Sequence, residues 1–194
     1  MRDLDVRLAV RAKLEKKYYH DQDTRIVEEM GVWAGSVRID IAVINGELQG
    51  FELKSARDNL QRLPEQARLY SMVFDRVTLV SAERHQEDAI NLVPQWWGIT
   101  SALERRDGGV TLKRIRSARR NPAISPHQVA RLLWKSEALS ILENYGLDRG
   151  VRSATMDGMA KKLADTIPSQ VLLREVRQVL KFRSDWLGQP ISNQ

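Results

Sequence analysis

Two acidic side chains and a lysine in the first third of the chain have the residue types needed for metal-assisted chemistry on a phosphodiester. They are Asp40, Glu52 and Lys54. Mg²⁺ prefers oxygen ligands and usually takes only one or two carboxylates from the protein. The bound metal lowers the pKa of a water molecule and neutralises developing charge, and a lysine can position that water or stabilise the charge. The three residues therefore predict catalysis if the fold brings them together.

The surrounding sequence predicts that a β-hairpin positions these side chains. β-branched residues lead to Asn45-Gly46, and an apolar alternation resumes after this turn signal. Side chains alternate between the faces of a strand, so Glu52 and Lys54 share one face. On the first strand, Asp40 lies opposite the apolar face that is expected to consist of Ile39, Ile41 and Val43.

The register of this hairpin decides whether the carboxylates share a face. A two-residue Asn45-Gly46 turn pairs Asp40 with Phe51 and separates the two carboxylates. A three-residue loop, Ile44 to Gly46, pairs Asp40 with Gly50 and brings Glu52 diagonally beside it. We therefore expect paired residue numbers with an even sum, a bulge at or near Gly46, and a positive φ at that glycine.

The order of these residues resembles a known nuclease motif. Asp40 followed by Glu52-Leu53-Lys54 is similar to the D…(D/E)xK core of the PD-(D/E)XK, or restriction-endonuclease-like, superfamily, with Ile39 in place of its proline. Gln66 and Tyr70 resemble the Gln-x-x-x-Tyr pair of the RecB-like branch. The wider run from Arg38 to Gln66 is similar to a little-characterised bacterial and phage family within that superfamily.

The resemblance implies a deoxyribonuclease that uses Mg²⁺ or Mn²⁺. Its implied metal ligands and catalytic or positioning residues are Asp40, Glu52, Lys54, Glu29, Gln66 and Tyr70. Glu29 has a surface position as its alternative, and Gln66 and Tyr70 have helix-to-sheet packing as theirs. The alternative for the whole protein is a non-catalytic DNA-binding or scaffolding subunit of a repair, recombination or defence complex. The expected partner is DNA, with RNA not excluded, and a homodimer or larger complex stays open.

Charge agrees with a polyanionic partner. The 194 residues carry 31 lysines and arginines against 25 acidic residues, a net charge of +6. The segment 113–120 concentrates five of these cations and is a candidate for phosphate contact, with a solvated strand end and linker as the alternative. The predicted nucleic-acid-binding residues are Arg38, Lys113, Arg114, Arg116, Arg119 and Arg120.

Cysteine is absent, which excludes disulfides and thiolate zinc sites. The first residues, 1–5, are too charged for a secretory signal, and no apolar run approaches the length of a membrane span. These features predict a cytoplasmic protein that does not contact a membrane.

The pattern of elements predicts an α/β fold with a restriction-endonuclease-like mixed sheet flanked by helices. We expect a nuclease-like domain over 1–120 and a small helical domain over 121–194. The strand at 76–80 should lie parallel to the strand that ends at Lys54, because a helix separates them. The other expected elements are helices at 4–18, 58–73, 83–91, 127–145, 154–166 and 168–184, an extended segment at 25–30, and edge strands at 96–100 and 110–115.

Overall fold

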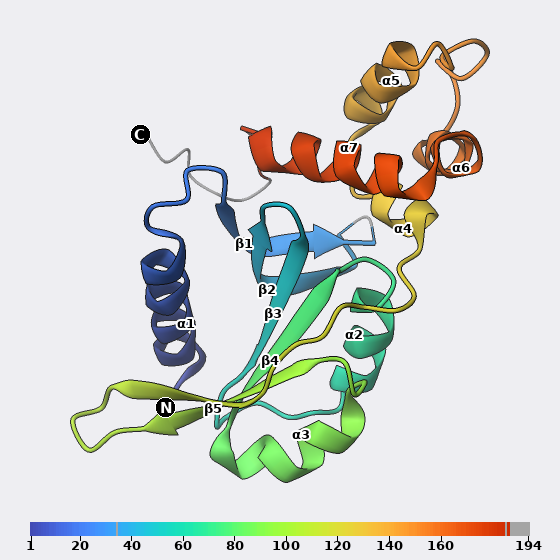
Figure 1. Ribbon diagram of the computed structural model, residues 1–194. Coiled ribbons are helices and arrows are strands. Elements are labelled where there is room, and N and C mark those ends of the chain that lie inside the picture. The colour runs from blue at the N-terminus through green and yellow to red at the C-terminus, as the bar shows by residue number, and fades with distance from the viewer. Residues whose placement is uncertain (34, 185, 187–194) are drawn as a thin grey trace.

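A six-stranded sheet with helices on both faces forms the centre of the protein (Figure 1). The computed structural model describes residues 1–33, 35–184 and 186. The strands lie in chain order across the sheet: β1 (Arg25–Val32), β2 (Val37–Ile44), β3 (Leu48–Lys54), β4 (Arg76–Ala82), β5 (Gly98–Glu104) and β6 (Val110–Arg116).

The helices cover the two faces unequally (Figure 1). One face carries α1 (Asp3–Tyr18), whereas α2 (Leu63–Tyr70) and α3 (Gln86–Leu92), which follows the short helix η1 (Glu83–His85), cover the other. The C-terminal region comprises α4 (Pro126–Ala130), α5 (Lys135–Asn144), α6 (Met156–Thr166) and α7 (Ser169–Phe182). The predicted mixed α/β sheet and C-terminal helices are confirmed; a restriction-endonuclease-like fold is not.

The connections explain the strand directions. β3, β4 and β5 run parallel, joined by crossovers through α2 and α3, and the other neighbours are antiparallel. The predicted parallel pairing of β3 with β4 is confirmed. β5 was expected at an edge, which is wrong, because the crossover through α3 inserts it between β4 and β6.

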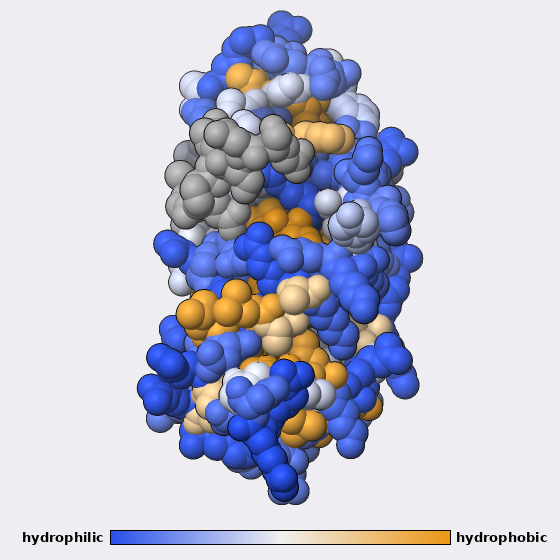
Figure 2. Space-filling model, turned by 90° about the vertical axis from the view of Figure 1, so that its left-hand side faces the viewer, coloured by the Kyte–Doolittle hydropathy of each residue, from blue (hydrophilic) through white to orange (hydrophobic). Residues whose placement is uncertain are grey.

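Two separate hydrophobic clusters hold the layers together. The smaller core lies under α1 and consists of Val6, Val10, Leu14, Ile41, Val43, Leu53, Val80 and Ala102. The larger core joins the opposite sheet face to α2, α3 and the C-terminal helices. Leu4 and Leu8 of α1 lie outside this core and are 61% and 57% exposed. On the side that carries α1, apolar patches interrupt a largely polar surface (Figure 2).

At Asp40, the alternation of side chains between the two faces of the sheet is interrupted in both β1 and β2. Ile39 packs in the larger core, whereas Ile41 and Val43 pack in the smaller one. The predicted single apolar face of these three residues is therefore wrong. The cause lies opposite Asp40, where Glu29 has a left-handed φ of 51° and interrupts the β1–β2 ladder without changing its register.

Two expected helices differ in length from the observed ones. α2 begins at Leu63 rather than near 58, because the preceding residues form turns in which the Asp58 carboxylate accepts from the Ser55 amide at 2.7 Å. The expected helix 127–145 is divided into α4 and α5. The intervening turn buries Leu132 and Leu133, and the Glu137 carboxylate then accepts from the Trp134 amide to begin α5.

Polar contacts fasten the C-terminal helices to the sheet region. Arg177 of α7 pairs with the buried Asp75 at 2.6 Å, and Lys181 pairs with Asp23 at 2.6 Å. The Asn121 amide donates to two backbone carbonyls, at residues 71 and 74. The domain boundary at 120/121 stays a prediction.

Among the residues that the structure describes, no helix is both long and apolar enough to cross a membrane. The cytoplasmic location stays a prediction.

Candidate functional site

The β2–β3 hairpin brings Asp40 and Glu52 to one hollow, which both side chains line. Ile41 pairs with Phe51, and every pair in the ladder has an even sum. The even-sum prediction is confirmed. The loop has three residues, but it spans 45–47 rather than 44–46, so Gly50 pairs with Ala42 and the predicted pairing of Asp40 with Gly50 was wrong. The positive φ predicted for Gly46 was wrong as well. The Asn45 side chain closes the loop by accepting from the Glu47 amide at 3.0 Å, so no left-handed glycine is required.

Arg7 of α1 is the residue that the sequence reasoning missed. Its guanidinium pairs with the Asp40 carboxylate at 2.8 Å and with the Glu29 carboxylate at 2.8 Å, and it donates to the Asp40 carbonyl at 3.1 Å. Its side chain is only 14% exposed. The one local sequence feature of Arg7 is its spacing of four from Asp3. Such pairs are common on helix surfaces, so this spacing does not indicate a functional site.

Lys54 and Glu52 form a second, more deeply buried ion pair. The Lys54 ammonium lies 2.7 Å from Glu52 Oε1, with side-chain exposures of 7% and 2%, and also donates to Gln66 Oε1 at 3.0 Å. The Gln66 amide reaches the Tyr70 hydroxyl at 3.5 Å, and that hydroxyl donates to the Arg38 carbonyl. The predicted residues of the hairpin and of α2 therefore do come together.

Burial dominates the electrostatics of this cluster. Burial, followed by the neighbouring Glu52 carboxylate, raises the pKa of Asp40 to about 7. Burial also raises the pKa of Glu52, against the lowering effect of Lys54. The Tyr70 hydroxyl has its pKa raised by burial and by the charge of Glu52. The two carboxyls thus hold protons more tightly than exposed carboxyls do.

The carboxylates do not form an open cation site in this arrangement. Both Asp40 oxygens are engaged, one with Arg7 and the other with the Leu53 amide at 2.8 Å. Glu52 Oε1 accepts from Lys54, while Oε2 is buried and has no hydrogen-bond partner in the described part of the chain. No group of three or more acidic or histidine side chains within that part could hold a metal ion. A divalent ion would have to displace Arg7, and Mg²⁺ or Mn²⁺ stays a prediction.

The remaining predicted site residues lie in several different places. Arg38 is exposed and lines the hollow around Asp40. Tyr70 is fully buried and stacks with Trp97 at 6.4 Å between ring centroids, so helix-to-sheet packing accounts for most of its contacts. Arg119 and Arg120 are exposed after the end of β6, and Lys113 lies on the strand face opposite Arg114.

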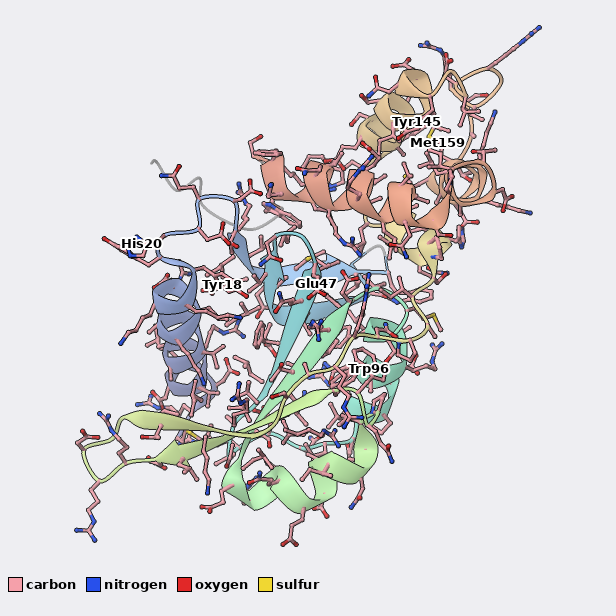
Figure 3. The ribbon with its side chains drawn as sticks, in the orientation of Figure 1. Tyr18, His20, Glu47, Trp96, Tyr145 and Met159 are labelled. Carbon is pink, nitrogen blue, oxygen red and sulfur yellow. The ribbon has the colours of Figure 1, made fainter. Side chains whose placement is uncertain are left out.

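Arg114 and Arg116, from the predicted basic run, line a different hollow, which we call the basic groove. It has a volume of about 480 Å³ and lies between α1, the open sheet face and β6. Glu47, labelled in Figure 3, lies at its β2–β3 end. The groove is lined by Val10, Lys13, Leu14, Lys17, Glu47, Gln49, Phe51, Arg76, Thr78, Val80, Thr100, Leu112, Arg114, Arg116, Ser117 and Ala118.

Five cations and one carboxylate give the basic groove its charge. The carboxylate, Glu47, is already paired with Arg76 at 2.7 Å, and that hydrogen bond lowers the pKa of Glu47. Arg116 is fixed by donating to the Trp97 carbonyl at 2.7 Å. Lys13 and Arg114 are exposed, and no carboxylate of the described chain forms a salt bridge with either.

Sequence reasoning found only part of this groove. Lys13 and Lys17 are four apart and therefore share one face of α1. The two lysines lie near the start of the sheet region and Arg114 lies near its end, so no local sequence pattern connects them. The antiparallel edge position of β6 beside α1 brings them together.

Comparison with known proteins identifies the family. The family model for bacteriophage P4 protein cII matches residues 2–190. Protein cII of Enterobacteria phage P4 is 31% identical over 147 residues, which are 76% of this chain and 55% of that relative. The chain thus spans about half the length of this relative. No solved structure matches.

These matches correct the assignment made from the sequence. The PD-(D/E)XK superfamily, the metal-dependent nuclease activity and the nuclease-derived alternative are wrong, because both matches name the P4 cII protein and not a nuclease. The roles predicted for Asp40, Glu52 and Lys54 lose the resemblance on which they rested. Since the family match covers nearly the whole chain, the protein belongs to the bacteriophage P4 protein cII family.

Proposed function

We propose that this protein binds nucleic acid in the basic groove. The observation that carries the proposal is that five cations and one carboxylate line the groove, so that four cations remain once Arg76 pairs with Glu47. Lysine and arginine side chains that neutralise phosphates release condensed counterions, and this release favours binding. The groove therefore has the electrostatic character that a phosphate backbone requires.

The cations differ in how they would contact phosphate. Arg116 is held by a hydrogen bond to the Trp97 carbonyl, so its position is set before a ligand arrives, whereas Arg76 is already paired with Glu47. Lys13, Lys17 and Arg114 are exposed and able to adjust. Fixed arginines favour orientation of a phosphate, and exposed lysines favour attraction without sequence preference.

The test is salt-dependent binding of fluorescently labelled oligonucleotides measured by anisotropy. Lys13→Gln with Arg114→Gln should weaken binding and reduce the slope of log affinity against log salt by roughly two, about one per lost phosphate contact. The matched control is Lys135→Gln with Lys161→Gln, which removes the same charge from exposed positions on the C-terminal helices. Equal effects of both pairs, or no binding of any oligonucleotide at low salt, would overturn the proposal.

A further inference from the structure

The floor of the basic groove is the part of the sheet face that α1 leaves uncovered. Alternate residues share a strand face, so Gln49 and Phe51 lie on the same side as Leu53 of the smaller core. Phe51 pairs with Thr78 across β3 and β4, and Thr100 pairs with Arg114 across β5 and β6. The floor thus contains one aromatic ring, and hydroxyl groups, an amide and cations surround it.

Phe51 differs from the other large aromatic residues of the sheet region. Trp97, Tyr70 and Phe74 are fully buried, whereas Phe51 packs only in part against the smaller core and is partly exposed. It is the one aromatic residue among the described residues that line the groove. An apolar ring is therefore open to a ligand that the surrounding cations attract.

The size of the groove favours a single strand of nucleic acid over a duplex. Its volume of about 480 Å³ lies within the range of pockets that hold a small molecule, about 300–1,000 Å³. Such a space accommodates a nucleotide or two, but not the stacked pairs of a duplex, whose base faces are already covered. A single strand can place an unstacked base on an aromatic ring while its phosphates follow a cationic groove.

We infer that the basic groove binds single-stranded nucleic acid and that Phe51 is the platform on which one base stacks. This inference rests on the proposed function and adds the class of ligand. Lys13 of α1 and Arg114 of β6, which both line the groove, contact the phosphates that flank the stacked base. Thr78, next to Phe51 in the ladder, offers a hydroxyl to the edge of that base.

The experiment compares three labelled probes by fluorescence anisotropy: a DNA single strand, an RNA strand of the same sequence and the corresponding DNA duplex. The single strands should bind at least about tenfold more tightly than the duplex. The comparison of DNA with RNA identifies which strand the groove prefers. Phe51→Leu should weaken single-strand binding by about 5- to 150-fold, the range for losing one stacked base.

Phe182→Leu is the matched control, because Phe182 is 73% exposed on α7, away from the groove. Thermal melting of each variant without nucleic acid shows whether Phe51→Leu keeps the fold. Leucine is chosen because it retains most of the apolar contact of phenylalanine. Cross-linking of a strand containing 5-iodouracil to the wild-type protein provides a readout that needs no variant. The cross-linked peptide should contain Phe51.

The outcomes separate the inference from the proposed function. Equal or tighter binding of the duplex, an unchanged affinity in a folded Phe51→Leu variant, or cross-links outside the groove would overturn the single-strand inference. The proposed function would then still stand if Lys13→Gln with Arg114→Gln reduced the salt slope. Absence of binding to all three probes would overturn both.

Discussion

Replacing Asp40 by Asn should change how the stability of the protein depends on pH. Asp40 is buried beside Glu52, and burial followed by that neighbour raises its pKa from 3.8 to about 7. The folded state therefore binds this proton more tightly than the unfolded chain does. The resulting stabilisation is fully present below about pH 4 and is lost as the pH rises through about 7.

The magnitude follows from the two pKa values. A pKa raised from 3.8 to about 7 corresponds to as much as roughly 4 kcal/mol in the free energy of unfolding between these pH values. Asn is neutral at every pH, like the protonated acid, but its single oxygen can accept from the Leu53 amide or from Arg7 and not from both. The lost hydrogen bond lowers the stability of the variant equally at every pH, whereas the missing titration changes how its stability depends on pH.

Urea denaturation at pH 4, 5, 6, 7 and 8 measures the effect. The stability of Asp40→Asn relative to that of wild type should increase by up to about 4 kcal/mol as the pH rises from 4 to 8. Asp165→Asn, which changes an exposed carboxylate on α6, serves as the control. A difference between Asp40→Asn and wild type that is independent of pH, or that changes in the opposite direction, would refute the reasoning.

Two further predictions concern the same cluster. Lys54→Met should lower the free energy of unfolding by about 3–5 kcal/mol in urea titrations, because it leaves the buried Glu52 carboxylate unpaired, and adding Glu52→Gln should restore most of the loss. A Lys54→Met variant as stable as wild type would show that the pair contributes nothing. If the carboxylates can hold a cation, Arg7→Gln should bind Mn²⁺ more tightly than wild type in water-proton relaxation titrations, since Arg7 competes for Asp40. Equal Mn²⁺ response in both proteins would exclude that competition.

The local features of the fold were accessible from the sequence. The hairpin, its even register and the parallel partner of β3 follow from strand alternation and from the helix between Lys54 and Arg76. The loop position and the φ of Gly46 were not accessible, because the Asn45 side chain closes the loop without a left-handed glycine. The break between α4 and α5 depends on burial of Leu132 and Leu133 against other helices, which periodicity alone does not show.

The prediction of a metal beside Asp40 missed Arg7 for a related reason. Asp40, Glu52 and Lys54 come from one hairpin and line one hollow, and their predicted roles stay predictions. What occupies the space beside Asp40 is set by Arg7, from a helix 33 residues away in the chain, and this cation takes the place that the motif suggested for a metal. The groove residues Lys13 and Arg114 are also united only by tertiary structure.

The division of the core into two clusters has a consequence for the order in which the protein opens. Among the described residues, the buried side chains of α1 belong to the smaller core alone, so α1 can separate from the sheet while the larger core stays closed. Amide hydrogens in α1 would then exchange with solvent through a partial opening, before those of β3 and β4. A ligand bound in the basic groove, as proposed, would touch both α1 and the sheet and would therefore slow this first step of unfolding.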